Sequence, residues 1–184
     1  GRIRAPAALL TSAASRLTVR GPDLAKLTSA LAAVAKVRLV VGIQGSEAAD
    51  IEEASESKRP LTLVEIGSVH EFGTKDGKIP ERSFLRGTLD KKESAYGKAL
   101  TGALQRALDE VSIDGIGDVA GAFARQLDVL GLRVVRDVQT TIRDSGPGWP
   151  PNAPLTIALK GSSKPLIDTG RLRQSIRHAV RVEP

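Results

Sequence analysis

Histidine and glutamate side chains are the residues in this chain best suited to acid–base or metal chemistry. His70 and Glu71 open the stretch HEFGT, which begins like the HExxH helix of zinc proteases. Thr74 stands where that pattern needs its second histidine, and the only other histidine, His178, lies far along the chain. We therefore expect no metal site. A histidine near the end of an amphipathic helix is more simply a packed or surface residue.

Other catalytic patterns are missing from the sequence. No serine lies in GxSxG, no segment matches GxGxxG after a strand or GxxxxGK[ST], and the chain has no cysteine. The carboxylate pairs Glu52-Glu53 and Asp109-Glu110 lie in an expected loop and at an expected helix end. A general acid–base pair needs surroundings that separate the two pKa values, and nothing here indicates them. We therefore expect neither enzymatic activity nor a cofactor.

Arginines near the C-terminus form the most distinctive polar pattern. Arg171 and Arg173 follow the turn residue Gly170 in PLIDTGRLRQSI, and Arg177 and Arg181 fall on one face of an expected strand. These side chains could bind phosphates in a salt-dependent manner, bind carboxylates of a neighbouring subunit, or simply be solvated. Aromatic residues are not interleaved, so stacking on single-stranded bases is not expected.

Charge is concentrated at the two ends of the chain. Residues 1–20 carry +4, residues 160–184 carry +4, and residues 21–159 carry −2, within a total of +6. We interpret residues 1–20 as a basic arm, in which Arg2 and Arg4 are further candidates for contact with DNA or an interface. A basic excess indicates a polyanion or an acidic partner, although solvated chain ends are the alternative. No apolar run is long enough to cross a bilayer.

The elements that must position these residues follow from hydrophobic periodicity. The pattern predicts a helix over 21–36, a strand from Val37, and a mobile acidic loop over 45–60. Gly42 inside the strand suggests a bulge or a close backbone approach. Thr62 and Glu65 have capping-box spacing for a helix that Gly73 ends in a left-handed conformation. A turn is then expected at Asp76-Gly77.

The second half of the chain is dominated by two long helical patterns. They cover 83–111 and 116–143 and predict an antiparallel helical hairpin over 83–143. A Pro/Gly-rich loop over 144–166 contains one short helical turn, and the alternation in SIRHAVRV predicts a final strand. We expect one α+β domain over 21–184, with a small, mostly antiparallel sheet. Two strands are marginal alone, so a further strand, a helix or a neighbouring subunit must complete it.

Three stretches resemble segments of tailed-bacteriophage neck proteins. VEIGSVHEFGTKDGKIPERSFLRGTLD resembles A-x-x-HEFG followed by IP-x-R-PFLR, and GWPPNAPLTIALKGSSKPLIDTGRLRQSI resembles W-x-P-L-x-x-x-T-x-x-x-K followed by PLIDTGRLRxSI. Upstream, VRLVVGI resembles the strand V-x-VGI. The chain is thus similar to the tail-completion, or head–tail joining, group, the virion morphogenesis proteins of Mu-like phages. The motif residues are His70, Glu71, Phe72, Gly73, Pro80, Phe84, Leu85, Arg86, Trp149, Asp168, Thr169, Gly170 and Leu172.

The resemblance implies a non-enzymatic structural protein of the virion, assembled in the host cytoplasm. It implies a ring, commonly a hexamer, at the head–tail junction around the channel through which DNA leaves. Head-completion and tail-terminator proteins are then the expected partners, with channel DNA as a further candidate and no membrane. It also implies that Leu172 and Ile176 anchor the C-terminal segment in the core, leaving the arginines on a surface. A basic DNA-binding module acting on packaged or exiting DNA is the alternative function.

One residue departs from the family pattern. Ser83 stands where these proteins often have proline. The acidic stretch 45–60 is a second departure, and both leave the loop contacts open.

Overall fold

The computed structural model describes residues 2–3, 23–44, 51–52, 61–111 and 118–183. The chain forms two compact units. The first contains Val41–Lys91 and Val134–Arg177, and the second contains Arg2–Val40, Lys92–Arg133 and His178–Pro184. Helices and a small sheet make up the described residues, which confirms the α+β class.

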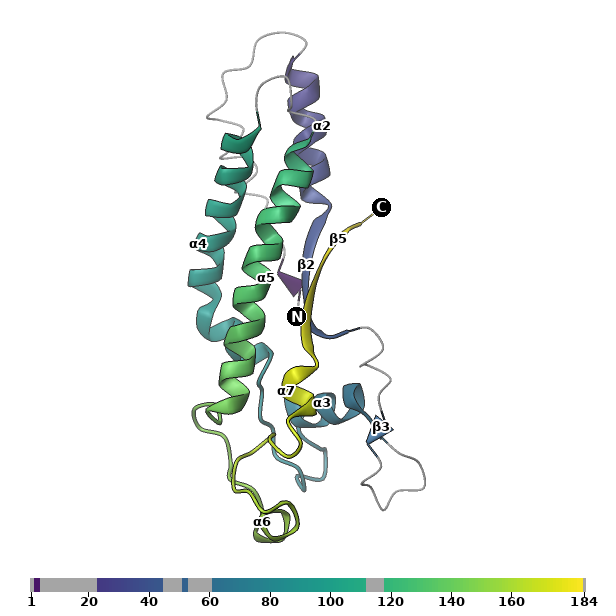
Figure 1. Ribbon diagram of the computed structural model, residues 1–184, viewed down its shortest axis with the longest axis vertical. Coiled ribbons are helices and arrows are strands. Elements are labelled where there is room, and N and C mark those ends of the chain that lie inside the picture. The colour runs from purple at the N-terminus through teal and green to yellow at the C-terminus, as the bar shows by residue number, and fades with distance from the viewer. Residues whose placement is uncertain (1, 4–22, 45–50, 53–60, 112–117, 184) are drawn as a thin grey trace. The chain divides into compact units, whose positions relative to one another are not determined.

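The second unit begins with a helix that runs directly into a strand. Helix α2 (Asp23–Ala35) is followed after one residue by β2 (Val37–Ile43), as the periodicity predicts (Figure 1). A short strand β1 (Arg2–Ile3) pairs antiparallel with β2, with Ile3 opposite Leu39. The basic arm was expected without a strand, so β1 is an additional element. The rest of that arm, including Arg4, lies outside the described residues.

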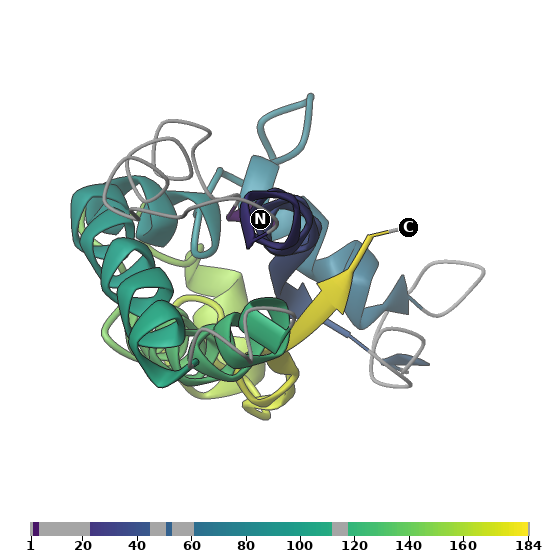
Figure 2. The same ribbon diagram turned by 90° about the horizontal axis from the view of Figure 1, so that it is seen from above.

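The final strand completes a three-stranded sheet. Strand β5 (Ile176–Val182) lies beside β2 in the order β1-β2-β5. In the second unit, the Glu183 backbone N–H donates to the Lys36 carbonyl over 2.9 Å, so the end of β5 meets the start of β2 (Figures 1 and 2). The two strands are therefore antiparallel, as expected. Strand β1 adds a third strand to this sheet, which is one of the three predicted ways of completing it.

Helices α4 (Arg86–Glu110) and α5 (Val119–Arg143) pack side by side in the second unit. The part of α4 in this unit is Lys92–Glu110, and the part of α5 is Val119–Arg133. Arg106 Nε donates to Gln126 Oε1 over 2.8 Å, and Arg125 pairs with Glu110 over 2.6 Å, so the helices run antiparallel. This confirms the predicted hairpin, while the connecting residues 112–117 lie outside the described chain. The buried side chains of this unit include Leu27, Val34, Leu39, Tyr96, Leu100, Leu104, Phe123, Leu127 and Leu130.

The first unit is organised around helix α3 (Leu63–Phe72). The predicted capping box is present: Thr62 Oγ1 accepts from the Glu65 N–H, and the Glu65 carboxylate accepts from the Thr62 N–H. Gly67 lets α3 approach its neighbours, because an added Cβ would lie 2.9 Å from Ile43 Cδ1. The buried side chains of this unit include Val41, Leu63, Phe84, Val134, Val138, Ile142, Leu172 and Ile176.

Several boundaries of the first unit differ from the expectations. Strand β3 (Ile51–Glu52) pairs with β4 (Leu61–Thr62) inside a segment predicted as loop, whose remaining residues are not described. Gly73 has the expected positive φ of 70°, but its ψ of 178° is extended rather than left-handed helical. Gly42 has nothing within 4 Å of an added Cβ, so no close backbone approach occurs there.

One short helix lies within the Pro/Gly-rich segment, and a second follows that segment. Helix α6 (Pro154–Lys160) matches the expected helical turn, with Pro154 at its first position. Helix α7 (Arg171–Gln174) follows Gly170, whose φ of 82° confirms the predicted turn. Leu172 and Ile176 are buried, as the resemblance implied.

Candidate functional site

Two of the motif stretches, far apart in sequence, meet in the first unit. The Arg82 side chain is almost fully buried and extends to the segment after Trp149. Its Nε donates to the Pro150 carbonyl over 3.0 Å and its Nη2 donates to the Pro151 carbonyl over 2.9 Å. The Arg82 backbone N–H also donates to the His70 carbonyl over 2.8 Å. One residue thus joins the end of α3 to the Pro/Gly-rich segment.

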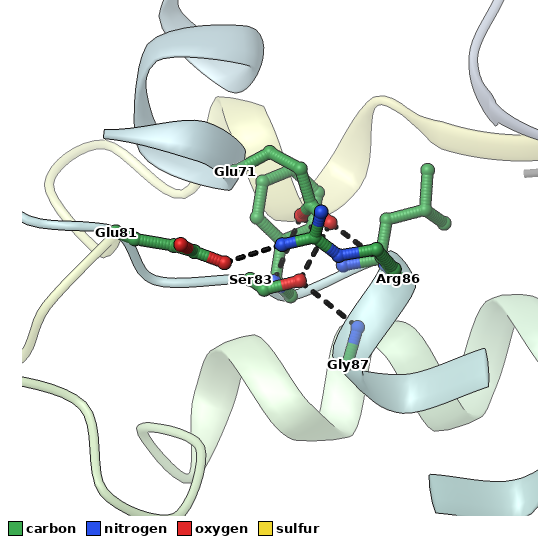
Figure 3. Close-up of polar contacts among 7 residues, drawn as sticks. Glu71, Glu81, Ser83, Arg86 and Gly87 are labelled. Atoms are coloured by element: carbon green, nitrogen blue, oxygen red, sulfur yellow. Dashed lines mark hydrogen bonds and ion pairs between the residues drawn. The ribbon is translucent and has the colours of Figure 1, made fainter. Parts of the chain in front are cut away.

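The Glu71 carboxylate caps the N-terminus of α4 (Figure 3). Its Oε1 accepts from Ser83 Oγ over 2.7 Å and from the Arg86 N–H over 2.8 Å. Its Oε2 accepts from the N–H groups of Phe84 and Leu85, each over 2.9 Å. These are donors that a helix start leaves without intrahelical partners, and a negative charge there also complements the helix dipole. Glu71 therefore holds α3 against α4.

The start of α4 explains the departure at Ser83. Ser83 Oγ donates to Glu71 and accepts from the Gly87 N–H over 2.9 Å, so the hydroxyl completes the cap (Figure 3). A proline could not form either bond. The regular helix begins at Arg86, three residues later than the periodicity predicts, and the N–H groups of Phe84 and Leu85 just before it donate to Glu71.

An exposed pair of motif residues lies beside this cap. The Arg86 guanidinium pairs with the Glu81 carboxylate and lies 5.4 Å from the centroid of the Phe72 ring, a cation–π distance. Phe72 is 64% exposed although it belongs to an apolar helix. It borders an apolar groove of about 390 Å³, whose other lining residues include Ile43, Val64, Leu85, Leu89 and Ile176.

His70 occupies a different environment from its neighbour Glu71. Burial, together with the positive charges of Arg82 and Lys160, lowers the pKa of His70 from 6.5 to about 4. The imidazole is therefore neutral at neutral pH. Its Nδ1 is buried and has no hydrogen-bond partner within the described residues. The neighbouring Glu71 differs, because its two oxygens together accept four hydrogen bonds.

A second, polar cavity lies beside His70. It has a volume of about 190 Å³ and is lined by His70, Asn152, Lys160, Asp168, Thr169 and Arg171, among others. Lys160 Nζ donates to the carbonyls of Lys164 and Ile167, each over 2.6 Å, and burial lowers the pKa of the Lys160 ammonium. Asn152 Nδ2 donates to the Ser163 carbonyl over 3.1 Å. Residues of both motif stretches therefore line this cavity.

The predicted C-terminal residues have mixed roles. Helix α7 begins after Gly170 and has no side-chain cap. Thr169 Oγ1 accepts from the Arg171 N–H at 3.4 Å. Arg171 and Arg173 are half-buried.

The strand arginines and the remaining motif residues also have defined places. Arg177 is exposed and its guanidinium donates to the Gln174 carbonyl, while Arg181 is exposed in the other unit. Trp149 is half-buried against Gly146, and Pro80 is half-buried. The side chain of Arg2 is not among the described groups.

Some contributing residues were not singled out from the sequence. Arg82, Asn152 and Lys160 lie inside the motif stretches, yet their roles depend on backbone carbonyls 69, 11 and 7 residues away, respectively. No side-chain pattern encodes such acceptors. Within the described chain, no cluster of three or more metal-ligating side chains occurs. None of its helices has the length and apolarity to cross a membrane.

Comparisons of the chain with models of protein families, with curated proteins and with solved structures found no match.

Proposed function

We propose that this chain is a structural protein of the phage neck, forming a ring, commonly a hexamer, that completes the tail and joins it to the head around the DNA channel. The proposal rests on the resemblance of the three motif stretches. The observation that carries it furthest is that two of these stretches contact each other in one unit, through the Arg82 bonds to Pro150 and Pro151. The motifs therefore have a shared structural reason to occur together in one chain.

The environment of the motif residues favours assembly over catalysis. The Glu71 carboxylate is occupied by backbone and hydroxyl donors, so it serves the fold. Exposed apolar side chains remain on the same unit: Phe72 on α3 is 64% exposed, and Leu155 and Leu159 on α6 are 71% and 80% exposed. Exposed apolar groups in addition to an apolar groove are typical of protein–protein contact surfaces. A heterologous interface that closes on itself would produce the ring.

The partners follow from this placement in the virion. Copies of the chain itself would form the ring, with head-completion and tail-terminator proteins above and below it. The protein would assemble in the host cytoplasm and act without enzymatic activity, and DNA in the channel is a further contact.

Electron microscopy of phage particles produced without this protein tests the proposal. Filled heads and tails should accumulate unjoined, and adding the purified chain should restore joined, infective virions. Leu159→Ser should reduce this complementation, because it removes an exposed apolar side chain of the first unit without touching the core. Leu24→Ser, the same substitution at an exposed leucine of the other unit, is the matched control. Normal joined virions in the absence of the chain would refute the proposed function.

A DNA-binding module remains the alternative, since Arg177 and Arg181 are exposed on β5. A gel-shift titration of the full chain with duplex DNA separates the two functions. Binding that falls steeply with salt and is lost in the double variant Arg177→Gln, Arg181→Gln would favour the alternative. Absence of binding at low salt would remove it.

A further inference from the structure

The polar cavity beside α3 contains a buried group whose hydrogen-bonding capacity is unused. His70 lines this cavity of about 190 Å³, and its Nδ1 is buried without a partner among the described residues. A buried polar atom left unsatisfied is energetically costly, so such atoms are rare and call for an explanation. The volume exceeds what a single water needs, so the cavity has room for a small ligand.

Lys160 supplies a second donor at the same cavity, with one proton that none of the described residues accepts. An ammonium group has three protons, and the carbonyls of Lys164 and Ile167 accept two of them. Those carbonyls hold the ammonium in place, and burial lowers the pKa of Lys160 because the charged form is poorly solvated there. A group that brings negative charge to Lys160 would compensate this loss of solvation.

The charges around the cavity favour an anion. Lys160 and Arg171 line it, and Arg82 is close enough to act electrostatically on both His70 and Lys160. Asp168 is the opposing charge, and its side chain is exposed at the cavity rim. The positive groups therefore outnumber the negative one.

We propose that this cavity binds an oxyanion, a carboxylate or phosphate group, through Lys160 and the Nδ1 of His70. The neutral imidazole donates when Nδ1 carries its proton, and Lys160 supplies the charge-assisted bond. Thr169 and Arg171 also line the cavity. The site goes beyond the proposed ring function, because it needs neither a neighbouring copy nor DNA. The oxyanion is either a free ion or the carboxylate of an acidic protein side chain.

Imidazole nitrogen NMR on the full chain tests the site directly. The chain has two histidines, so His178 is an internal control for nonspecific effects. Potassium acetate and potassium phosphate are titrated separately at neutral pH, with potassium chloride keeping the ionic strength constant. We expect a saturable shift of the His70 nitrogens alone. Saturation by acetate at lower concentration indicates a carboxylate source, and saturation by phosphate at lower concentration indicates a free phosphate.

Three variants separate a built site from general ionic effects. Lys160→Gln should weaken binding at least about tenfold, since it removes the charged donor, whereas Lys98→Gln, on the exposed surface of α4, should leave the affinity unchanged. Asp168→Asn should tighten binding about threefold or more by removing the opposing charge. That variant changes an exposed side chain, so it remains informative if Lys160→Gln fails to fold. Linear shifts of both histidines, or equal affinities in all variants, would overturn the proposal.

Discussion

The Glu71 side chain and the Arg86 backbone are joined by a 2.8 Å hydrogen bond that fixes the end of one helix to the start of the next. The same carboxylate accepts from Phe84, Leu85 and Ser83, so one side chain satisfies three backbone N–H groups and a hydroxyl at this helix start. The group that first suggested metalloprotease chemistry thus has a structural role.

Replacing Glu71 should destabilise the fold. Glu71→Gln removes the charge and turns one acceptor into a donor, so we expect a loss of about 2 kcal/mol in the free energy of unfolding. Glu71→Ala should cost more, because several buried N–H groups lose their acceptor. Urea unfolding followed by far-UV circular dichroism measures both effects. Glu93→Gln, an exposed change on α4, should lie within about 0.5 kcal/mol of the wild type. Equal midpoints for Glu71→Gln and Glu93→Gln would contradict this role.

Arg82→Lys should loosen the segment that contains Trp149. Lysine keeps the charge but cannot donate to the Pro150 and Pro151 carbonyls with the planar fork of arginine, so we expect a loss of about 2 kcal/mol. Trp149 is the only tryptophan, so its fluorescence reports on this segment, and its emission should move to longer wavelength. Arg86→Lys, at an exposed pair with Glu81, should change stability by less than about 1 kcal/mol. An unchanged Trp149 emission in Arg82→Lys would show that these bonds do not order the segment.

The same glycine-to-alanine change should have opposite effects at two positions. Gly170 has a φ of 82°, which alanine adopts only with strain, so Gly170→Ala should cost about 1 kcal/mol. Gly97 lies inside α4 with nothing within 4 Å of an added Cβ. Gly97→Ala should therefore stabilise the protein by about 0.5–1 kcal/mol, by restricting the unfolded chain. Thermal unfolding of both variants provides the comparison, and shifts of the same sign would be inconsistent with the backbone assigned to Gly170.

Stability should fall as the pH drops below the ordinary pKa of histidine. The pKa of His70 is about 4 in the folded protein against 6.5 for an unperturbed histidine. Between these values the unfolded chain binds a proton that the folded chain does not, so acid favours unfolding. The loss should reach roughly 2 kcal/mol over about one and a half pH units below 6.5, and it should end near the folded-state pKa. Below that value, His70 contributes no further pH dependence.

His70→Asn isolates this contribution from the titration of carboxylates. Asparagine has no proton to gain in this range, so the variant should show a flatter dependence of unfolding free energy on pH. Urea unfolding at several pH values gives both slopes. Identical slopes for the two proteins would mean that His70 titrates normally in the folded state.

Local signals in the sequence predicted the elements well. The capping box at Thr62 and Glu65, the helical periodicity of α4 and α5, and the alternation of β5 each depend on neighbours within a few residues. The prediction that Leu172 is buried also holds. Glycine chemistry predicted the positive φ at Gly73 and Gly170 but not the extended ψ at Gly73.

Contacts with distant backbone atoms could not be predicted in this way. The acceptors of Arg82 are carbonyls, which every residue carries, so no side-chain pattern marks them. The cavity is equally hidden, because His70 and Lys160 come together only through the path of the chain between them. Strand β1 escaped prediction because two residues are too few to show an alternation.

The hydrogen bonds of Glu71 and those of Arg82 differ in how early they can form while the chain folds. Glu71 and its donors are separated by 12 to 15 residues, so closing that loop costs little entropy and can precede the rest of the fold. Arg82 must wait for acceptors 68 and 69 residues further along. The turn between α3 and α4 is therefore suited to belong to the folding nucleus, while the Pro150 segment docks late. Substitution of Glu71 would then lower the folding rate, whereas substitution of Arg82 would mainly raise the unfolding rate.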